Sequence, residues 1–262
     1  MPYHPRIECK KIATFQTTRS RNSELWFVNS YKLEQAVLGL VAKYSYRYQV
    51  KMYALAIEGN HMQFPALFPE GNRAHFMRDL NSSVARAIPR YQRTYPGGRF
   101  WARRYSAEYL PAPDDIEEQF FYTVLQPVQD GLVKDISKYT EYNCFEDAIT
   151  GRVLKFKVVR WKEYNDARRW NENVKIEDFT DICEFSYERL PGYEHLPSSE
   201  YIKLMRQKLK QRTEDILRER NGKKSLGPTT LKLIKPGVRP HKTKTSTVTS
   251  HRPRILSKDN ER

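Results

Sequence analysis

Residues Tyr53–Pro69 read Y-A-L-A-I-E-G-N-H-M-Q-F-P-A-L-F-P, and they predict the centre of the fold. Apolar residues alternate at Tyr53, Leu55 and Ile57, which places them on one face of a short β-strand. Glu58–Asn60 is a predicted tight turn, because its glycine and asparagine tolerate a positive φ. The stretch therefore predicts two β-strands joined as a hairpin.

His61 and Gln63 follow the turn, two residues apart on the second strand. Alternation directs both side chains to one face, while Met62 points to the other. An imidazole nitrogen and an amide oxygen on an otherwise apolar strand are potential ligands of a metal ion. A polar strand face that meets water explains the same pattern, so the strand alone leaves both interpretations open.

The composition predicts a globular protein with a strongly basic end. The 262 residues include 17 Tyr, 12 Phe and 4 Trp, and 39% are hydrophobic, which is enough for a core. Residues 201–262 hold 18 Lys/Arg against 5 Asp/Glu, so they carry +13 of the net charge of +15. We expect a polyanionic partner, most simply nucleic acid, although a solvated tail explains the charge as well.

The cysteines and the hydropathy point to the cytoplasm. Cys9, Cys144 and Cys183 are odd in number and far apart, which argues against a zinc site and a disulfide framework. The sequence has no apolar run of membrane length, and charges throughout residues 1–12 argue against a signal peptide. We therefore expect a protein of the reducing cytoplasm, associated with the nucleoid and without membrane contact.

The flanking sequence predicts an α+β fold. Strands are expected over residues 12–18 and 99–110, and helices over residues 31–46, 72–95 and 115–125. Pro89 and Pro127 are expected to end the second and third helices, and Asp114 with Glu117 matches a capping box. This order predicts a ferredoxin-like, antiparallel four-stranded sheet with helices on one face.

We divide the chain into three parts. Residues 1–150 are the predicted ferredoxin-like domain. Residues 151–220 are a C-terminal extension that ends in a basic helix over Tyr201–Arg220, where apolar residues recur at helical spacing. Residues 221–262 are a basic tail rich in Gly, Pro, Lys, Thr and Ser, which we expect to be disordered when free.

Tyr122 and Gln126 are four residues apart on the third predicted helix, so they share one face. A tyrosine hydroxyl beside a metal-bound phosphate can attack a phosphodiester and form a phosphotyrosine. The Gln126 carbonyl oxygen can join His61 and Gln63 around the ion. Spacing alone favours the other interpretation, a tyrosine that packs in the core and a glutamine that caps the helix end.

Taken in order, these motifs resemble the single-tyrosine HUH transposases, in particular the REP-associated tyrosine transposase branch. The resemblance covers about residues 10–145, and it is most specific in Y-T-V-L-Q-P-V-Q-D-G-L-V at residues 122–133. In that family a Pro-Asn-His hairpin carries a metal-binding His-x-His pair. A helix with Tyr-Ile-x-x-Asn-Pro-Val-x-x-Gly-Leu-Val follows later in the chain.

The resemblance implies that Tyr122 is the nucleophile and that His61, Gln63 and Gln126 hold one Mg²⁺ or Mn²⁺ ion. Gln63 stands where the family has its second histidine, and Gly59 stands where it has proline. Glutamine is a neutral and weaker ligand than histidine, so we expect a lower metal affinity here. These departures concern cleavage more than the fold or DNA binding.

The resemblance further implies that the partner is a short hairpin in single-stranded DNA, and it allows a homodimer. Cationic and aromatic side chains suit phosphates and unpaired bases. The candidate contacts are Arg73, Arg78, Arg86 and Arg90 on the second predicted helix, and Arg99, Trp101, Arg103, Arg104 and Tyr105 on the strand after it.

The predicted function is metal-dependent cleavage and rejoining of single-stranded DNA beside such hairpins, through a 5′-phosphotyrosine. One alternative is a catalytically inactive, domesticated protein that still binds hairpins. Another is a basic RNA-binding accessory protein, which would bind RNA at least as well as DNA of the same hairpin.

Overall fold

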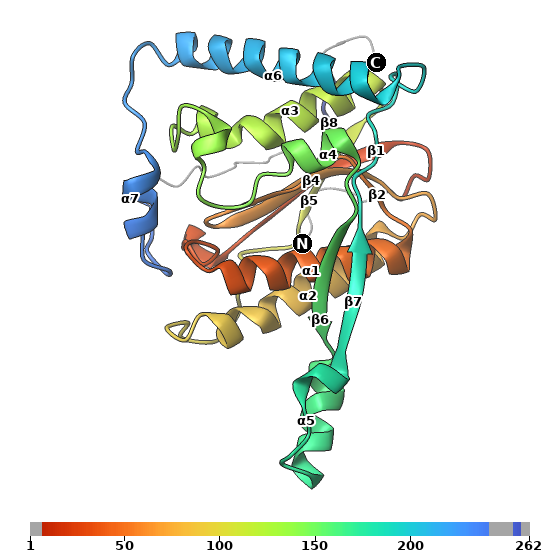
Figure 1. The fold of residues 1–262 in the computed structure, drawn as a ribbon, viewed down its shortest axis with the longest axis vertical. Coiled ribbons are helices and arrows are strands. Elements are labelled where there is room, and N and C mark those ends of the chain that lie inside the picture. Colours follow the sequence, from red (N-terminus) through yellow and green to blue (C-terminus); the bar gives the residue numbers. More distant parts are fainter. Residues whose placement is uncertain (1–6, 241–253, 258–262) are drawn as a thin grey trace.

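The computed structural model describes residues 7–240 and 254–257, and it confirms the α+β class (Figure 1). The strands are β1 Ala13–Arg19, β2 Lys51–Met52, β3 Ala56–Glu58, β4 His61–Leu67, β5 Ser106–Leu110, β6 Leu154–Val159, β7 Thr180–Phe185 and β8 Arg254–Ile255. The helices are α1 Tyr31–Tyr48, α2 Arg73–Tyr91, α3 Pro113–Gln129, α4 Phe145–Thr150, α5 Trp161–Trp170, α6 Ser198–Glu219 and α7 Pro228–Leu233. Short 3₁₀ helices lie at Arg21–Ser23, Ile136–Lys138 and Ile176–Phe179.

The main sheet has the strand order β2–β4–β1–β5–β8, and β3 also pairs with β4. The pairs that β4 makes with β1, β2 and β3 are antiparallel, as is the pair between β1 and β5. The predicted ferredoxin-like arrangement is thus present, with its second strand divided into β2 and β3. The short β8, which the sequence did not predict, is added in parallel to β5.

A β-bulge divides the first strand of the hairpin. β2 and β3 pair with β4 in registers that differ by one residue, so three residues oppose two. Pro65 accepts a hydrogen bond from the Tyr53 amide at 3.0 Å, but it has no N–H to donate back. The bulge reverses the alternation along this segment, so the single face predicted for Tyr53, Leu55 and Ile57 is wrong.

The predicted turn is present at Gly59 and Asn60, although neither residue has a positive φ. Glycine is needed at position 59 because a Cβ atom there would lie 2.7 Å from Leu25 Cδ2. The Gly59 carbonyl also accepts a hydrogen bond from the Phe27 amide at 3.0 Å. A close approach to the segment before α1, rather than a left-handed turn, explains this glycine.

The sheet is covered on both faces (Figure 1). Phe64 of β4 packs against Phe76 of α2, with ring centroids 6.0 Å apart, so α1 and α2 cover one face. Phe15 of β1 packs against Tyr122 of α3 at 5.9 Å, so α3 covers the opposite face. The prediction of helices on one face holds for α1 and α2, whereas α3 and the α6 helix outside it form a further layer.

Two prolines lie inside helices that the sequence predicted them to end. Pro89 lies in the last turn of α2, and α3 continues past Pro127 to Gln129. Near a C-terminus the lost N–H removes one hydrogen bond, while packing of the apolar face holds the rest of the helix. The helix start also differs, because Asp115 accepts the Ala112 amide at 3.0 Å in place of the predicted Asp114 cap.

The predicted strand over residues 99–110 is shorter in the structure. Only Ser106–Leu110 forms β5, and Trp101 makes a single bridge to Ser20. Residues 102–104 bend and are exposed. Two adjacent arginines that remain in solvent explain why this stretch leaves the sheet.

The C-terminal extension begins with a two-stranded ribbon and ends in the predicted basic helix. Leu154–Val159 is β6, and it pairs with β7. The ribbon packs on α1 at Gly39, where a Cβ atom would meet Val158 Cγ2 at 2.9 Å. The predicted helix over Tyr201–Arg220 is confirmed as α6.

Residues 221–240 are packed on the domain, in contrast to the predicted disordered tail. The side-chain Nδ2 of Asn29 donates to the backbone carbonyls of Leu231 at 2.9 Å and Ile234 at 2.7 Å. Leu25 and Val238 are joined by a backbone hydrogen bond of 2.9 Å. The remaining parts of the tail, residues 241–253 and 258–262, lie outside the described residues.

Cys9, Cys144 and Cys183 are free thiols. In the described part of the chain, no helix is both long and apolar enough to cross a membrane.

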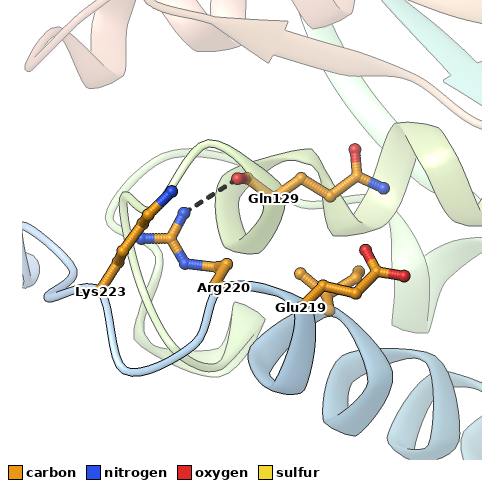
Figure 2. A pocket seen from close by; sticks show the side chains of 5 residues that line it. Gln129, Glu219, Arg220 and Lys223 are labelled. Carbon is orange, nitrogen blue, oxygen red and sulfur yellow. Dashed lines mark hydrogen bonds between the residues drawn. The ribbon is translucent and has the colours of Figure 1, made fainter.

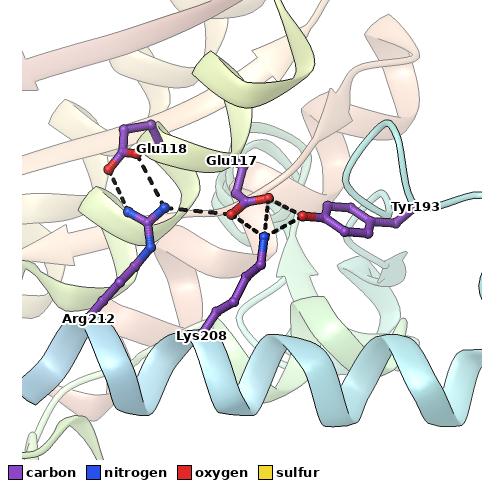
Figure 3. Close-up of polar contacts among 5 residues, drawn as sticks. All are labelled: Glu117, Glu118, Tyr193, Lys208 and Arg212. Atoms are coloured by element: carbon purple, nitrogen blue, oxygen red, sulfur yellow. Dashed lines mark hydrogen bonds and ion pairs between the residues drawn. The ribbon is translucent and has the colours of Figure 1, made fainter. Parts of the chain in front are cut away.

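A charged cluster joins α6 to α3 (Figure 3). Glu117 of α3 is 12% exposed and lies 2.7 Å from Lys208 Nζ of α6, and Arg212 of α6 pairs with Glu118. The hydroxyl of Tyr193 bonds to the same Glu117 carboxylate. We predict that Glu117→Ala lowers the free energy of unfolding by about 1–3 kcal/mol, because it leaves Lys208 without its partly buried partner.

Urea unfolding tests this prediction, with Glu146→Ala as the matched control. Glu146 of α4 also pairs with α6, through Arg206 at 2.7 Å, but both side chains are more than half exposed. We expect a loss below about 0.5 kcal/mol for this control. Equal losses in the two variants would contradict a structural role for the Glu117 cluster.

Candidate functional site

A cleft of about 1570 Å³ lies between α3 and the sheet face that α3 covers. The segment 226–240 and the residues around β8 form its outer wall. We call it the α3 cleft, and the side chains that carry its chemistry are Arg19, Glu58, His61, Gln63, Tyr122 and Gln126. The structure thus brings together all four residues that the sequence assigned to catalysis and metal binding.

His61, Gln63 and Gln126 form one buried hydrogen-bonded chain. His61 Nδ1 lies 2.8 Å from Asn60 Oδ1, so this nitrogen carries the proton and Nε2 keeps its lone pair. Gln126 Nε2 lies 3.0 Å from His61 Nε2, and Gln63 Nε2 donates to Gln126 Oε1. The alternation predicted for the second strand of the hairpin is therefore correct at His61 and Gln63.

His61 is neutral in this setting. Burial, with a smaller contribution from the positive charge of Arg19, lowers the pKa of His61 from 6.5 to about 4. Arg19 is the residue of β1 that pairs with His61 across the sheet. A neutral imidazole with a free Nε2 lone pair is the form that binds a metal ion.

The nitrogen and oxygen atoms of His61, Gln63 and Gln126 fit a divalent cation if the side-chain amides of the two glutamines are flipped by about 180°. A half-turn of the Gln126 amide places Oε1 where Nε2 now lies, 3.0 Å from His61 Nε2. Neighbouring ligands of an octahedral ion with bonds of about 2.1 Å are about 3 Å apart. No group of three or more His, Cys, Asp or Glu side chains in the described residues could hold a metal, so amide oxygens are needed.

Tyr122 projects from α3 into the cleft, and its side chain is 40% exposed. Partial burial raises the pKa of Tyr122, as do the charges of Asp130, Glu58 and Glu108, while Arg19 lowers it. The phenol is therefore protonated at neutral pH. It is accessible to a phosphodiester, but it needs help to lose its proton.

Glu58 is the main feature of the site that the sequence analysis missed. It pairs with His61 across the turn and is only 5% exposed. Burial, with a smaller contribution from the negative charge of Asp130, raises the pKa of Glu58 from 4.5 to about 8. A glutamate and a histidine that flank a two-residue turn would have been a signal for the site, had the bulge been foreseen.

The buried Glu58 predicts a pH-dependent stability. Its folded-state pKa is raised, so the stability it contributes is complete below about pH 4.5 and is lost as pH rises towards about 8. Each pH unit in this window lowers the free energy of unfolding by up to about 1.4 kcal/mol. Glu58→Gln should remove this loss, because an amide does not ionise.

Thermal or urea unfolding at pH 5.5 and pH 8.5 in a chelator tests this prediction. The other charged and titratable groups around the site, Arg19, His61, Tyr122, Asp130 and Tyr139, remain in both proteins. The stability difference between the variant and the wild type should grow with pH. An equal change in the stability of both proteins between the two pH values would show that Glu58 does not titrate in this window.

The predicted nucleic-acid contacts divide into two groups. Arg103, Arg104 and Tyr105 line the α3 cleft, where Tyr105 is buried and both arginines are exposed. Arg99 is exposed in the same connection, and the indole of Trp101 donates to the Asn81 carbonyl at 2.8 Å.

The arginines of α2 lie on the other side of the sheet. Arg78 pairs with Asp79 at 2.8 Å, Arg86 bonds to Ser82 at 2.6 Å, and Arg90 covers the Trp161 ring at 4.1 Å. All three are exposed. The structure does not bring them together with the α3 cleft.

Arg73 is a correction to the prediction. Its side chain is 2% exposed, and it donates to the Ile7 carbonyl at 2.8 Å. Glu8 lies 3.9 Å away, and the Tyr109 ring lies beneath the guanidinium. Arg73 therefore holds the N-terminal segment against the domain and is not available to a phosphate.

Arg239 and Arg254 were also missed. Both line the α3 cleft from the C-terminal segments. Arg239 donates to the Asn22 carbonyl at 3.1 Å, and Arg254 pairs with Glu108 of β5. The sequence placed them in a disordered tail, so no local signal could assign them to the site.

A second hollow, of about 410 Å³, lies at the C-terminal ends of α3 and α6 (Figure 2). Arg220 donates to the Gln129 carbonyl at 3.0 Å, which satisfies the end of α3. The hollow is lined by Gln129, Ile216, Glu219, Arg220 and Lys223. It holds no nucleophile beside a base, and it serves as a junction between helix ends.

Comparisons with known proteins add little to this geometry. No protein-family model and no curated protein matches the chain. Among solved structures, the chain is similar to a REP-associated tyrosine transposase bound to a REP hairpin. The TM-score is 0.48 at 17% identity, over 56% of this chain and 84% of that one.

Proposed function

We propose that this protein binds hairpin-forming single-stranded DNA and cleaves and rejoins it through Tyr122. The observation that carries the proposal is an accessible tyrosine in the α3 cleft, beside the hydrogen-bonded chain of His61, Gln126 and Gln63. The order of sequence motifs supports the same chemistry.

In the proposed reaction, the Tyr122 oxygen forms a bond to phosphorus as the bond between phosphorus and O3′ breaks. The phenol gives up its proton, and the departing O3′ takes one up and leaves as a hydroxyl. The 5′-phosphate remains on Tyr122, so a later 3′-hydroxyl can reverse the step and rejoin the strand.

His61 Nε2 and the oxygens of Gln63 and Gln126 would hold one Mg²⁺ or Mn²⁺ ion. When bound, the ion polarises the phosphate and offsets its charge. Asn60 keeps the His61 ring in the tautomer that leaves Nε2 unprotonated, because Asn60 Nδ2 is itself fixed by the Ser23 carbonyl at 3.1 Å.

A pool of labelled single-stranded hairpin DNAs tests the proposal, incubated with Mn²⁺ or with a chelator. We expect shortened strands with free 3′-hydroxyl ends only when Mn²⁺ is present. Binding of the same hairpins without any cleavage would contradict the enzymatic part.

Cleavage-free binding would favour the second candidate, an inactive hairpin-binding protein. A specific observation favours that candidate, since Gln63 bonds to Gln126 and Gln126 bonds to His61, so these hydrogen bonds already occupy the donor atoms. Stronger binding to RNA than to DNA of the same hairpin would instead support the RNA-binding alternative.

The bound single-stranded DNA should follow the arginines of the α3 cleft. We predict that Arg103→Ala with Arg104→Ala weakens single-stranded DNA binding at low salt. The slope of log affinity against log salt should fall by about 1.4, because each lost phosphate contact accounts for about 0.7. Fluorescence anisotropy at several salt concentrations measures both quantities.

The matched control removes the same charge from the far side of the sheet. Lys32 and Arg47 are exposed on α1, away from the cleft. Lys32→Ala with Arg47→Ala should leave the slope unchanged. Equal effects of the two double variants would mean that only net charge matters and that the α3 cleft is not the path.

A further inference from the structure

Glu58 owes its position in the α3 cleft to the β-bulge. Met52 pairs with Ala66, and Glu58 pairs with His61. In an unbroken strand, residues 52 and 58 would share a face, and Glu58 would point into the apolar layer beneath α1 and α2. The extra residue turns Glu58 to the other face, beside His61 and opposite α3.

The Glu58 carboxyl is left incomplete in this position. Its Oε1 atom is shielded from solvent and has no hydrogen-bond partner among the residues that the structure describes. The side chain is 5% exposed. A buried carboxyl oxygen without a partner has lost its hydrogen bonds to water and has not replaced them. A hydrogen-bond donor or a cation that would pair with this oxygen is therefore missing from the site.

The neighbours of Glu58 do not supply that group. His61 across the turn has its Nδ1–H on Asn60 and its Nε2 facing Gln126, so neither nitrogen serves the carboxyl. Asp130 is an acid, and its charge acts against ionisation of Glu58. A divalent cation between Glu58 and the His61 Nε2 side of the cleft would satisfy both.

We infer that Glu58 is a ligand of the divalent cation, together with His61 Nε2 and the Gln126 carbonyl oxygen. The inference rests on the proposed function, because it concerns the same ion. Glu58 supplies the anionic oxygen that the neutral Gln63 does not, and oxygen ligands with one imidazole suit Mn²⁺ and Mg²⁺. Gln63, which is hydrogen bonded to Gln126, stays in the ligand set of the proposed function.

Titration of the full-length, metal-free protein with Mn²⁺ tests the inference, by calorimetry and by the loss of the free-ion signal in electron paramagnetic resonance. Wild type should bind one ion. Glu58→Gln keeps the shape of the side chain and should weaken the binding constant at least about tenfold, since it removes a charged ligand. The rise in Tm that Mn²⁺ causes should fall in parallel.

The matched control is Glu108→Gln. Glu108 lines the same cleft but is paired with Arg254, so its replacement should change Mn²⁺ affinity less than twofold. A circular dichroism spectrum and a Tm without metal show that each variant folds.

The outcomes separate this inference from the proposed function. Equal Mn²⁺ binding by wild type and Glu58→Gln would overturn the inference and leave the tyrosine chemistry intact. Absence of Mn²⁺ binding by wild type would overturn it too, and DNA adducts formed in a chelator would then show that Tyr122 acts without the ion. Weakened binding in Glu58→Gln alone would support the inference even if no DNA were cleaved.

Discussion

Tyr122→Phe should abolish covalent protein–DNA adducts, with a loss of at least about 10³-fold in cleavage rate. The variant lacks only the hydroxyl that attacks phosphorus. Its ring still packs edge-on against Phe15, so the fold and the affinity for hairpin DNA should stay within about twofold of wild type. Denaturing gels measure the adduct, and anisotropy measures the binding.

Tyr139→Phe is the matched control for this experiment. Tyr139 also lines the α3 cleft, but burial and the surrounding carboxylates raise its pKa well above the usual value. The Tyr139→Phe variant should therefore form adducts at the wild-type rate. Adducts that persist in Tyr122→Phe and disappear in Tyr139→Phe would mean that the nucleophile has been assigned to the wrong residue.

Phe64→Ala should produce the largest loss of stability, about 3–5 kcal/mol. Phe64 is fully buried on the face of β4 that α2 covers, and its ring meets that of Phe76. Truncation removes apolar surface and leaves a cavity that neighbouring side chains cannot fill. The Tm should fall by roughly 10 °C, as differential scanning calorimetry would show.

Tyr46→Ala serves as the control, because Tyr46 of α1 is 85% exposed. It should change the free energy of unfolding by less than about 0.5 kcal/mol. If Phe64→Ala were equally mild, the layer between β4 and α2 would not be the core of the domain.

The elements that the sequence predicts best are those with local rules. The stripe at Phe76, Leu80, Val84 and Ile88 needs only a helical period, and all four side chains are fully buried in α2. The shared face of His61 and Gln63 needs only strand alternation. Both rules hold because nothing interrupts either element.

The bulge before Glu58 does not follow from any local rule. It depends on Pro65 of β4, which has no N–H to donate to the opposite segment. Which segment lies opposite Pro65 is known only once the register of the strands is known. A shift of one residue decides whether Glu58 belongs to the core or to the site. Sequence periodicity therefore identified two of the polar side chains of the hairpin and missed the third.

The C-terminal wall of the cleft was missed for a different reason. Residues 221–240 have the composition of a disordered tail, yet contacts from far away in the chain hold them in place. Asn29 fixes two carbonyls around α7, and Leu231 is buried. Contacts over some 200 residues leave no trace in a window of sequence.

The most direct test of the central claim is to identify the residue that becomes attached to DNA. Wild-type protein is incubated with a single-stranded hairpin substrate and Mn²⁺, digested with protease and nuclease, and analysed by tandem mass spectrometry. We predict one modified peptide, with a 5′-nucleotide on Tyr122 that is absent after incubation with a chelator. A nucleotide on any other residue, or cleaved DNA without a modified peptide, would contradict the assignment of Tyr122 as the nucleophile.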